Sequence, residues 1–431
     1  MSDNFVIENP KRRPSTAVGR DEWFPYYAGF SGTFARKLIQ SSGLAQESTV
    51  VDPWNGSGTS TAAAAICGHH ALGFDLNPVM AVVAKARLLP SIELPSVAPL
   101  LSEIAMKASN NDHGLLDGDP LLIWFMPASA AEIRSIERAI HVLLVCSDPT
   151  SSSVDAASQM SSMASFFYVA LFRAVRQLLG RFKASNPTWI TRPASLRSRT
   201  RPTPSEIRSS FNSQVSTMSV SIKAESRDLH VASADCMIDV ASSDSLPIPA
   251  NTVDMVLSSP PYCTRIDYGV ATSSELAVLG FQVENGLREL RGKLIGTPTI
   301  QGESHQPDLA WGIACNAFLD QVVQHPSKAA KSYYYKTYIQ YFDGIARSIS
   351  EIARCVKPYG KCIIVIQDSY FKGIRVDLAT IFTEIASANK LALSRQVDFP
   401  MSRTFAHINS NSRRYRSSSR SVESVLCYTK N

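Results

Sequence analysis

The interval from Thr49 to Asp75 constrains the fold of this chain more than any other part of it. A short apolar run (TVVDP) leads into a glycine-rich turn, a helix-like run (TSTAAAAICG) and a second short apolar run (HALGFDL). Strand, turn, helix and strand within roughly thirty residues form the βαβ unit of a parallel sheet. Asn77-Pro78 then favours a further helix, because the N–H that proline lacks would be unpaired in the first turn anyway.

The same alternation returns in the second half of the chain. Sheet-like text resumes at residues 230–235 (HVASAD) and 252–262 (TVDMVLSSPPY), and GKCIIVIQDS (360–369) is an almost uninterrupted apolar run. An apolar run of that kind is typical of a strand buried on both faces. Helical spacing precedes and follows it, and SVLCYTK predicts a last strand near Asn431. Helices that alternate with short buried strands predict a doubly wound, Rossmann-like α/β sheet.

A long interval between these two parts has a different pattern. Residues 91–226 have mostly helical periodicity, and they include a basic, turn-rich segment at 181–208. We interpret this interval as an insertion into the sheet domain and as a candidate target-recognition region. The predicted organisation is a polar N-terminal segment (1–20), a catalytic domain (21–90 and 227–431), a helical and basic insertion (91–226), and a variable loop region within the catalytic domain (281–326).

The overall composition excludes several classes of protein. Of 431 residues, 45% are hydrophobic and 19% are charged, as in a soluble globular protein, and the net charge is +6. The N-terminal text is too polar for a secretory signal, and Arg173 and Arg176 interrupt the longest apolar stretch, so it cannot span a bilayer. Eight scattered cysteines without a C-x-x-C pair argue against a disulfide framework and a metal site. These features predict a cytoplasmic enzyme that uses neither metal nor membrane.

The glycine-rich turn, DPWNGSGTS (52–60), lies where a predicted strand ends and a helix begins. In open α/β sheets, ligands bind at such places. Gly56 and Gly58 allow a sharp turn and a close approach of the backbone to a ligand, and the free N–H groups of the next helix favour a carboxylate or phosphate. Asp75, about twenty residues on, stands where an acidic side chain accepts both hydroxyls of a ribose.

Three explanations of this turn compete. A structural turn accounts for a lone G-x-G. A dinucleotide site is disfavoured because Thr61 replaces the third glycine of G-x-G-x-x-G, and a phosphate-binding P-loop is excluded because no G-K-[ST] follows. A ligand with a ribose and an amino-acid-like end fits, and S-adenosylmethionine has both.

A second motif, Ser259-Pro260-Pro261-Tyr262, directly follows the apolar strand TVDMVL. In isolation it could be a polyproline turn. At the end of a sheet strand, two prolines fix the backbone and leave carbonyls free to point into a cleft. An exocyclic amino group of a nucleic-acid base is a poor nucleophile, and its pKa is too high for any side-chain base to deprotonate it. A serine hydroxyl and a proline carbonyl can instead accept hydrogen bonds from its two N–H groups. Tyr262 supplies a ring on which an extruded base can stack.

Together, DPWNGSGTS, GFDLNP and SSPPY resemble the amino-methyltransferases of prokaryotic restriction-modification systems, the N4-cytosine and N6-adenine group. The resemblance implies a class I methyltransferase sheet, with S-adenosylmethionine on the glycine loop and Asp75. It places Asp235, in SADC, beside the adenine, and the segment 24–39 over the methionine end. Trp54 and Gly32 depart from the usual Phe and Pro. The implied cofactor-binding residues are Tyr26, Phe30, Ser31, Asp52, Pro53, Trp54, Asn55, Gly56, Ser57, Gly58, Thr59, Asp75, Leu76, Asn77, Asp235 and Cys236.

The function implied is transfer of a methyl group from S-adenosylmethionine to an exocyclic amino group of a DNA base that is flipped into the S-P-P-Y pocket. Serine at the head of that motif favours cytosine N4 over adenine N6, and the catalytic residues are Ser259, Pro260, Pro261 and Tyr262. The implied partners are duplex DNA and a cognate restriction nuclease or defence protein, in a prokaryotic nucleoid. Alternatives are methylation of RNA bases or of protein amides, and a non-catalytic, methyltransferase-like nucleic-acid-binding component of a defence system.

Two arginine-rich segments, 181–208 and 403–420, are candidates for DNA contact, although solvated loops explain them as well. Arg265 and Asp267 could line the pocket mouth or simply pin their loop. The tyrosines of 333–341 have the spacing of a helix face, which favours core packing. The candidate nucleic-acid-binding residues are Arg181, Lys183, Trp189, Arg192, Arg197, Arg199, Arg265, Arg413 and Arg414.

Overall fold

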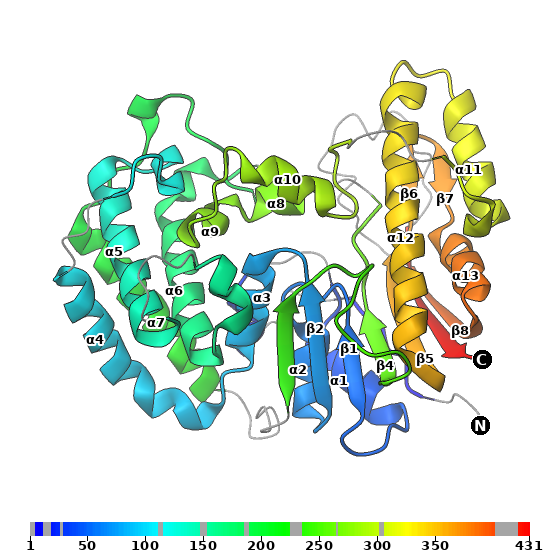
Figure 1. The fold of residues 1–431 in the computed structure, drawn as a ribbon, viewed down its shortest axis with the longest axis horizontal. Helices are drawn as coiled ribbons and strands as arrows, with labels where there is room; N and C mark the ends of the chain where they lie inside the picture. Colours follow the sequence, from blue (N-terminus) through cyan, green and yellow to red (C-terminus); the bar gives the residue numbers. More distant parts are fainter. Residues whose placement is uncertain are drawn as a thin grey trace.

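The sheet at the centre of the molecule has seven strands in the order β3-β2-β1-β4-β5-β9-β8 (Figure 1). The computed structural model describes residues 5–11, 19–25, 29–110, 115–146, 153–184, 189–224, 235–263, 266–300, 306–400 and 421–431. Strands β1 to β5 pair in parallel, whereas β9 is antiparallel to both of its neighbours. The strands are β1 (Thr49–Asp52), β2 (His70–Asp75), β3 (Cys236–Val240), β4 (Val253–Ser258), β5 (Val356–Gln367), β8 (Leu391–Pro400) and β9 (Val422–Lys430).

The predicted doubly wound, Rossmann-like sheet is confirmed. Strand β1 lies between β2 and β4, so the order of the strands along the chain reverses between β1 and β4. Val50 pairs with Met255 and Val51 with Val256, which brings the carboxyl ends of the two strands together. Ligands of open α/β sheets bind in the crevice at such a switch point.

Helices cover both faces of the sheet, as the alternation of side chains along each strand requires. Val50 of β1 lies in the core under α1 (Gly32–Ser41) and α2 (Thr59–Ile66). The next residue, Val51, lies in the core under α12 (Tyr335–Cys355) and α13 (Leu378–Ala388). Both faces of the parallel strands are therefore buried, which accounts for their continuous apolar text.

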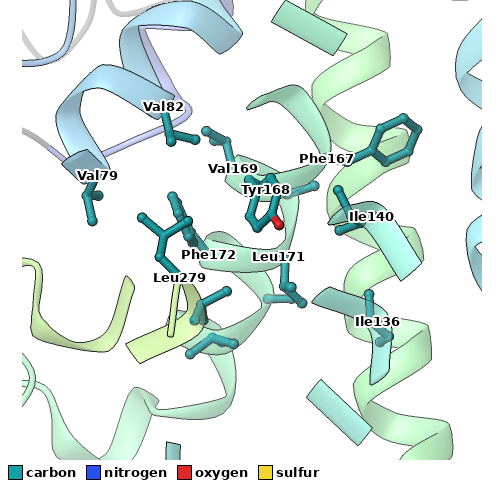
Figure 2. Close-up of a cluster of buried hydrophobic side chains, with 14 of the residues drawn as sticks. Val79, Val82, Ile136, Ile140, Phe167, Tyr168, Val169, Leu171, Phe172 and Leu279 are labelled. Carbon is teal, nitrogen blue, oxygen red and sulfur yellow. The ribbon is translucent and has the colours of Figure 1, made fainter. Parts of the chain in front are cut away.

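The interval interpreted as an insertion forms four α-helices, and one of them, α6 (Ser162–Leu178), packs directly on α3 (Pro78–Arg87). Figure 2 shows Val79 and Val82 of α3 in one cluster with Val169 and Phe172 of α6, and all four side chains are buried. The helices of this interval therefore share one hydrophobic core with α3 and α9 (Ser273–Val278), next to the two cores on the faces of the sheet. The four helices are α4 (Val97–Ser109), α5 (Pro127–Leu144), α6 (Ser162–Leu178) and α7 (Pro204–Lys223).

The interval 281–326, expected to be a variable loop region, contains two helices, α10 (Gly286–Lys293) and α11 (Ile313–Gln324). In α11 the buried residues Cys315, Phe318, Leu319 and Val322 follow helical spacing, but the polar, glycine-containing text before them masks this pattern. The other elements after β4 are α8 (Tyr268–Ala271), α9 (Ser273–Val278), a π-helix (Ala330–Tyr334) that leads into α12, and the hairpin β6–β7 (Ser369–Phe371 and Ile374–Val376).

No single helix among the described residues is both long and apolar enough to cross a membrane. Helix α3 and the segment Ser91–Ser109 reach that length and apolar character only when taken together, and they are bent by 100° relative to each other. Within the same residues, no group of three His, Cys, Asp or Glu side chains could hold a metal ion.

Candidate active site at the carboxyl ends of β1, β2 and β4

Asp52, the last residue of β1, ties the glycine loop to β4. Its Oδ1 accepts hydrogen bonds from the Ser258 hydroxyl, at the end of β4, and from the backbone N–H of Trp54 at 3.1 Å. Its Oδ2 accepts from the Ser60 hydroxyl at 2.5 Å. Burial raises the pKa of Asp52 to about 6, although these hydrogen bonds act in the opposite direction. Asp52 therefore holds the loop in place at the switch point.

The loop turns at two glycines in the left-handed region, Gly56 with φ 49° and Gly58 with φ 80°. A Cβ on Gly58 would lie 2.7 Å from the Cβ of Ala84, so only glycine lets the start of α2 pack this closely on α3. No side chain caps α2, and the first N–H groups of a helix have no partner within it. The loop therefore presents backbone donors to a ligand.

Asp75 ends β2 and faces the same loop. Its Oδ2 accepts from the backbone N–H of Gly56 at 3.0 Å, and its Oδ1 accepts from the N–H of Asn77 at 2.8 Å. Burial raises its pKa to about 6, with the two backbone hydrogen bonds lowering it and the charge of Asp52 raising it further. A carboxylate has about four acceptor positions, so Asp75 keeps acceptors for two hydroxyl groups.

The loop also holds two buried donors, Trp54 Nε1 and Asn55 Nδ2, without a hydrogen-bond partner in the described part of the chain. Buried polar groups are seldom left unpaired in proteins, so each calls for an explanation. Gly73 of β2 provides the space for the Asn55 amide, because a Cβ there would lie 2.4 Å from Nδ2. The Asn55 amide therefore lies under the loop against β2, whereas Asp75 and the start of α2 fit a polar ligand with a ribose and a carboxylate, as S-adenosylmethionine has.

The S-P-P-Y segment follows β4 and its backbone is fixed on three sides. The Tyr341 hydroxyl of α12 donates to the carbonyl of Pro261 at 3.0 Å, and Ser369 Oγ donates to the carbonyl of Cys263 at 3.2 Å. The N–H of Tyr262 donates to the hydroxyl of Tyr268 at 3.3 Å.

The two acceptors named from the sequence take no part in this network. The Ser259 hydroxyl and the Pro260 carbonyl have no hydrogen-bond partner within the described ranges, whereas the next carbonyl, that of Pro261, is occupied. Ser259 is half-buried and Pro260 is buried. Two acceptors without a described partner therefore lie on a fixed backbone beside the glycine loop.

Tyr262 connects this segment to the N-terminal part of the chain. Its hydroxyl oxygen lies against the backbone N–H of Gly29, and burial raises its pKa. The neighbouring Phe30 is buried and packs edge-on against Phe34 of α1 at 5.3 Å between ring centroids. Ser31 caps α1 by accepting from the N–H of Phe34 at 3.1 Å. Phe30 and Ser31 thus serve the fold beside the site, and Tyr26 lies outside the described residues.

The placement of Asp235 beside the adenine is wrong. Strand β3 begins at Cys236, so Asp235 precedes it and lies at the amino edge of the sheet, opposite the glycine loop. Its side chain is 98% exposed, 4.0 Å from His70 Nδ1. Cys236 also stands at this edge, half-buried. The residues that β3 brings to the carboxyl edge are Asp239 and Val240, because the strand runs parallel to β2.

The remaining predicted residues divide between the loop and helix ends. Pro53 and Ser57 belong to the glycine loop, Thr59 begins α2, and Leu76 packs on the helical core. Asn77 caps α3 through the N–H of Val79 at 3.1 Å and donates to Thr272 Oγ1 at 2.9 Å.

Asp267 accepts from the N–H of Val270 and pairs with Arg291 at 2.5 Å. Of the two roles considered for Asp267, this favours pinning of the loop. Arg265 lies outside the described residues.

Arg87, at the end of α3, is a site residue that the sequence did not indicate. Its guanidinium donates to the carbonyl of Ser57 at 2.6 Å and pairs with the carboxylate of Asp21. Arg20 in turn donates to the carbonyl of Arg87 at 2.7 Å. Nothing in the spacing of residues 20, 57 and 87 links them before the chain is folded. The contacts of Tyr268 and Tyr341 with the S-P-P-Y backbone were not predicted either, because the sequence around both residues resembles that of ordinary core helices.

The basic segment of the insertion is exposed in large part. Arg181 lies over the ring of Phe182 at 4.7 Å and donates to the carbonyl of Ser198. Arg413 and Arg414 lie outside the described residues. Lys183, Arg192 and Arg197 are exposed, whereas Trp189 and Arg199 are half-buried.

No family model matches the chain. A search of curated proteins finds the Type II methyltransferase M.BsoBI of Geobacillus stearothermophilus, 25% identical over 286 residues, which are 62% of this chain and 54% of that protein. This match supports a methyltransferase family. The chain spans about half the length of that relative.

Solved structures give weaker likenesses. A geranyl diphosphate methyltransferase in complex with GPP and sinefungin is 7% identical, with a TM-score of 0.32 over 98% of this chain and 96% of that one. The 16S rRNA (adenine(1408)-N(1))-methyltransferase of Catenulisporales acidiphilia is 11% identical, with a TM-score of 0.20 over 51% of this chain and 71% of that one. Scores this low give neither structure weight in the choice of substrate.

Proposed function

We propose that this protein transfers a methyl group from S-adenosylmethionine to an exocyclic amino group of a DNA base, with cytosine N4 before adenine N6. The observation that carries the proposal is the pair of unoccupied acceptors, Ser259 Oγ and Pro260 O, beside the loop that Asp52 and Asp75 hold. The name of the curated relative, a Type II methyltransferase, supports the reaction class. A nuclease or defence partner, and a place in the prokaryotic nucleoid, remain parts of this proposal.

The chain's own residues supply placement and hydrogen bonding. Asp75 would accept the ribose hydroxyls, and the N–H groups at the start of α2 would hold the carboxylate of the methionine end. When bound, S-adenosylmethionine supplies an electrophilic methyl group. Ser259 Oγ and the Pro260 carbonyl would accept hydrogen bonds from the two N–H groups of the target amino group. These bonds draw its nitrogen towards tetrahedral geometry and free its lone pair. Tyr262 would stack on the flipped base.

Replacement of Ser259 with Ala should lower kcat about 100-fold, because one of the two acceptors is lost from the transition state. The measurement is transfer of labelled methyl to duplex DNA, followed by analysis of the modified nucleosides. Calorimetry should find the affinity of the variant for S-adenosylmethionine unchanged, which separates lost chemistry from lost folding. A variant as active as the wild type would remove Ser259 from the mechanism.

The same assay tests the proposed function itself when duplex DNA, a structured RNA and a peptide are offered together. Methylcytosine or methyladenine in the DNA is the expected product, with the methyl group on the exocyclic nitrogen. Transfer to RNA alone, or to no nucleic acid in spite of tight cofactor binding, would refute it.

Affinity for S-adenosylmethionine should fall as the pH drops below about 6. Asp75 accepts two hydroxyls only as a carboxylate, and its raised pKa of about 6 means that it gains a proton below that pH. A carboxyl that binds a proton in the free protein and releases it on ligand binding weakens affinity by up to about tenfold per pH unit. Calorimetric Kd values between about pH 8 and about pH 5 check this, and a flat profile would contradict it.

A further inference from the structure

A second basic region lies around the amino end of α12, on the side of the sheet away from the insertion. The 22 residues from Gln321 to Phe342 contain three lysines and no acidic residue. Lys328, Lys331 and Lys336 are exposed, and none forms a salt bridge within the described residues. Exposed cations that lie close together along the chain and are not neutralised by an ion pair attract a polyanion.

This region includes an unusual stretch of helix and an adjoining hairpin. Ala330–Tyr334 forms a π-helix, a conformation that is rare and often found at functional sites. Its Tyr334 packs against Phe371 of β6 at 4.9 Å between ring centroids, and Lys372 Nζ lies 6.0 Å from the Tyr334 ring. The hairpin thereby adds a fourth lysine. We call Lys328, Lys331, Lys336 and Lys372 the lysine surface.

The elements that carry the lysine surface contact the segment that holds the free acceptors. The Tyr333 hydroxyl donates to the carbonyl of Pro298 at 3.0 Å, and in the same loop a Cβ on Gly296 would lie 2.9 Å from the carbonyl oxygen of Tyr262. From the hairpin, Ser369 donates to the carbonyl of Cys263. Two separate contacts therefore join this surface to the S-P-P-Y segment.

The basic segment of the insertion stands on the other side of the same edge. In Figure 1 the amino end of α12 and the segment between α6 and α7 both rise beyond the carboxyl ends of the strands, on opposite sides of β1 and β4. Residues 181–205 contain six cationic side chains and no acidic residue. The S-P-P-Y segment thus lies between two segments rich in basic residues, and Asp320 of α11 is the acidic residue that acts on Tyr335 beside Lys336.

We propose that the lysine surface binds the phosphate backbone of the duplex DNA whose target base enters the S-P-P-Y pocket. The inference rests on the proposed function, because it takes duplex DNA as the substrate. Lysine is a flexible point charge that contacts phosphates without reading bases, whereas the insertion carries the arginines suited to bidentate contacts. The lysine surface therefore supplies affinity and orientation that do not depend on sequence.

The test compares the wild type with the triple variant Lys328→Gln/Lys331→Gln/Lys336→Gln in DNA binding at several salt concentrations. Each phosphate contact contributes about 0.9 to the slope of log K against log[salt], so three should lower its magnitude by about 3. Binding should weaken equally for unrelated duplex sequences. The matched control is Lys107→Gln/Lys223→Gln/Lys390→Gln, which removes three exposed lysines from other parts of the fold and should keep the wild-type slope.

The outcomes separate the two proposals. A wild-type slope in the variant, with tight DNA binding by both proteins, overturns the lysine surface and leaves the proposed function standing. If the wild type binds a structured RNA and not duplex DNA, the proposed function fails and this DNA-binding role fails with it. Unchanged melting temperature and unchanged affinity for S-adenosylmethionine in the triple variant show that any loss of DNA binding is local.

Discussion

Replacement of Asp75 with Asn should weaken the binding of S-adenosylmethionine roughly 100-fold. Asp75 is held by the N–H groups of Gly56 and Asn77, so its carboxylate is already oriented towards the glycine loop. Hydrogen bonds to a charged group contribute about 1.5–3 kcal/mol each, and the amide of Asn can accept through only one atom. Loss of about 2.7 kcal/mol corresponds to a 100-fold change in Kd. Isothermal titration calorimetry measures it directly.

The informative control is Asp235→Asn, since the family resemblance and the structure make opposite predictions for it. The resemblance places Asp235 beside the adenine, whereas the structure places it, fully solvated, at the amino edge of the sheet. We expect wild-type affinity in this variant. A large loss at Asp235 and none at Asp75 would reverse the assignment of the cofactor site to the carboxyl edge.

Much of the sheet could be predicted because its rules are local. The text of β1, the glycine turn and β2 obeys short-range patterns that hold wherever a βαβ unit forms, and the Asn77-Pro78 start of α3 is a local signal too. The S-P-P-Y segment was found for the same reason, since it directly follows an apolar strand. Its two acceptors were named from the sequence, but the contact that occupies the next carbonyl could not be foreseen, because Tyr341 lies 80 residues away.

Sequence-based prediction failed where the position of a side chain depends on the boundary of a strand or on a contact between distant residues. A start of β3 one residue after Asp235 places that side chain before the strand, and a shift of a few residues would have brought it to the other edge. The ends of helices and strands are the least certain part of any prediction from local sequence patterns. Arg87 supports the glycine loop from the far end of α3, and only packing of α3 against the loop brings them together. Such supports depend on tertiary structure and leave no trace in spacing.

A buried ionic network joins the insertion to the segment that follows the S-P-P-Y motif, and Arg134 of α5 is its centre. Its guanidinium donates to Asp119 at 2.9 Å and to Glu137 at 2.9 Å. It also donates to the carbonyls of Ala277 and Val278, at the end of α9, at 2.8 Å and 2.7 Å. All of these partners are buried, so the network fixes the insertion helices to α9 within the core.

Arg134→Met should therefore lower the free energy of unfolding by about 3–5 kcal/mol, because it leaves two carboxylates buried without their cation. Urea denaturation provides the measurement. The matched control is Arg208→Met, which breaks the more exposed pair with Glu132 and should change stability by less than about 1 kcal/mol. Equal losses in the two variants would mean that the network contributes no more than a surface pair. Because α9 follows the S-P-P-Y segment in the chain, Arg134→Met should also lower methyl transfer under conditions where the variant is fully folded, whereas Arg208→Met should not.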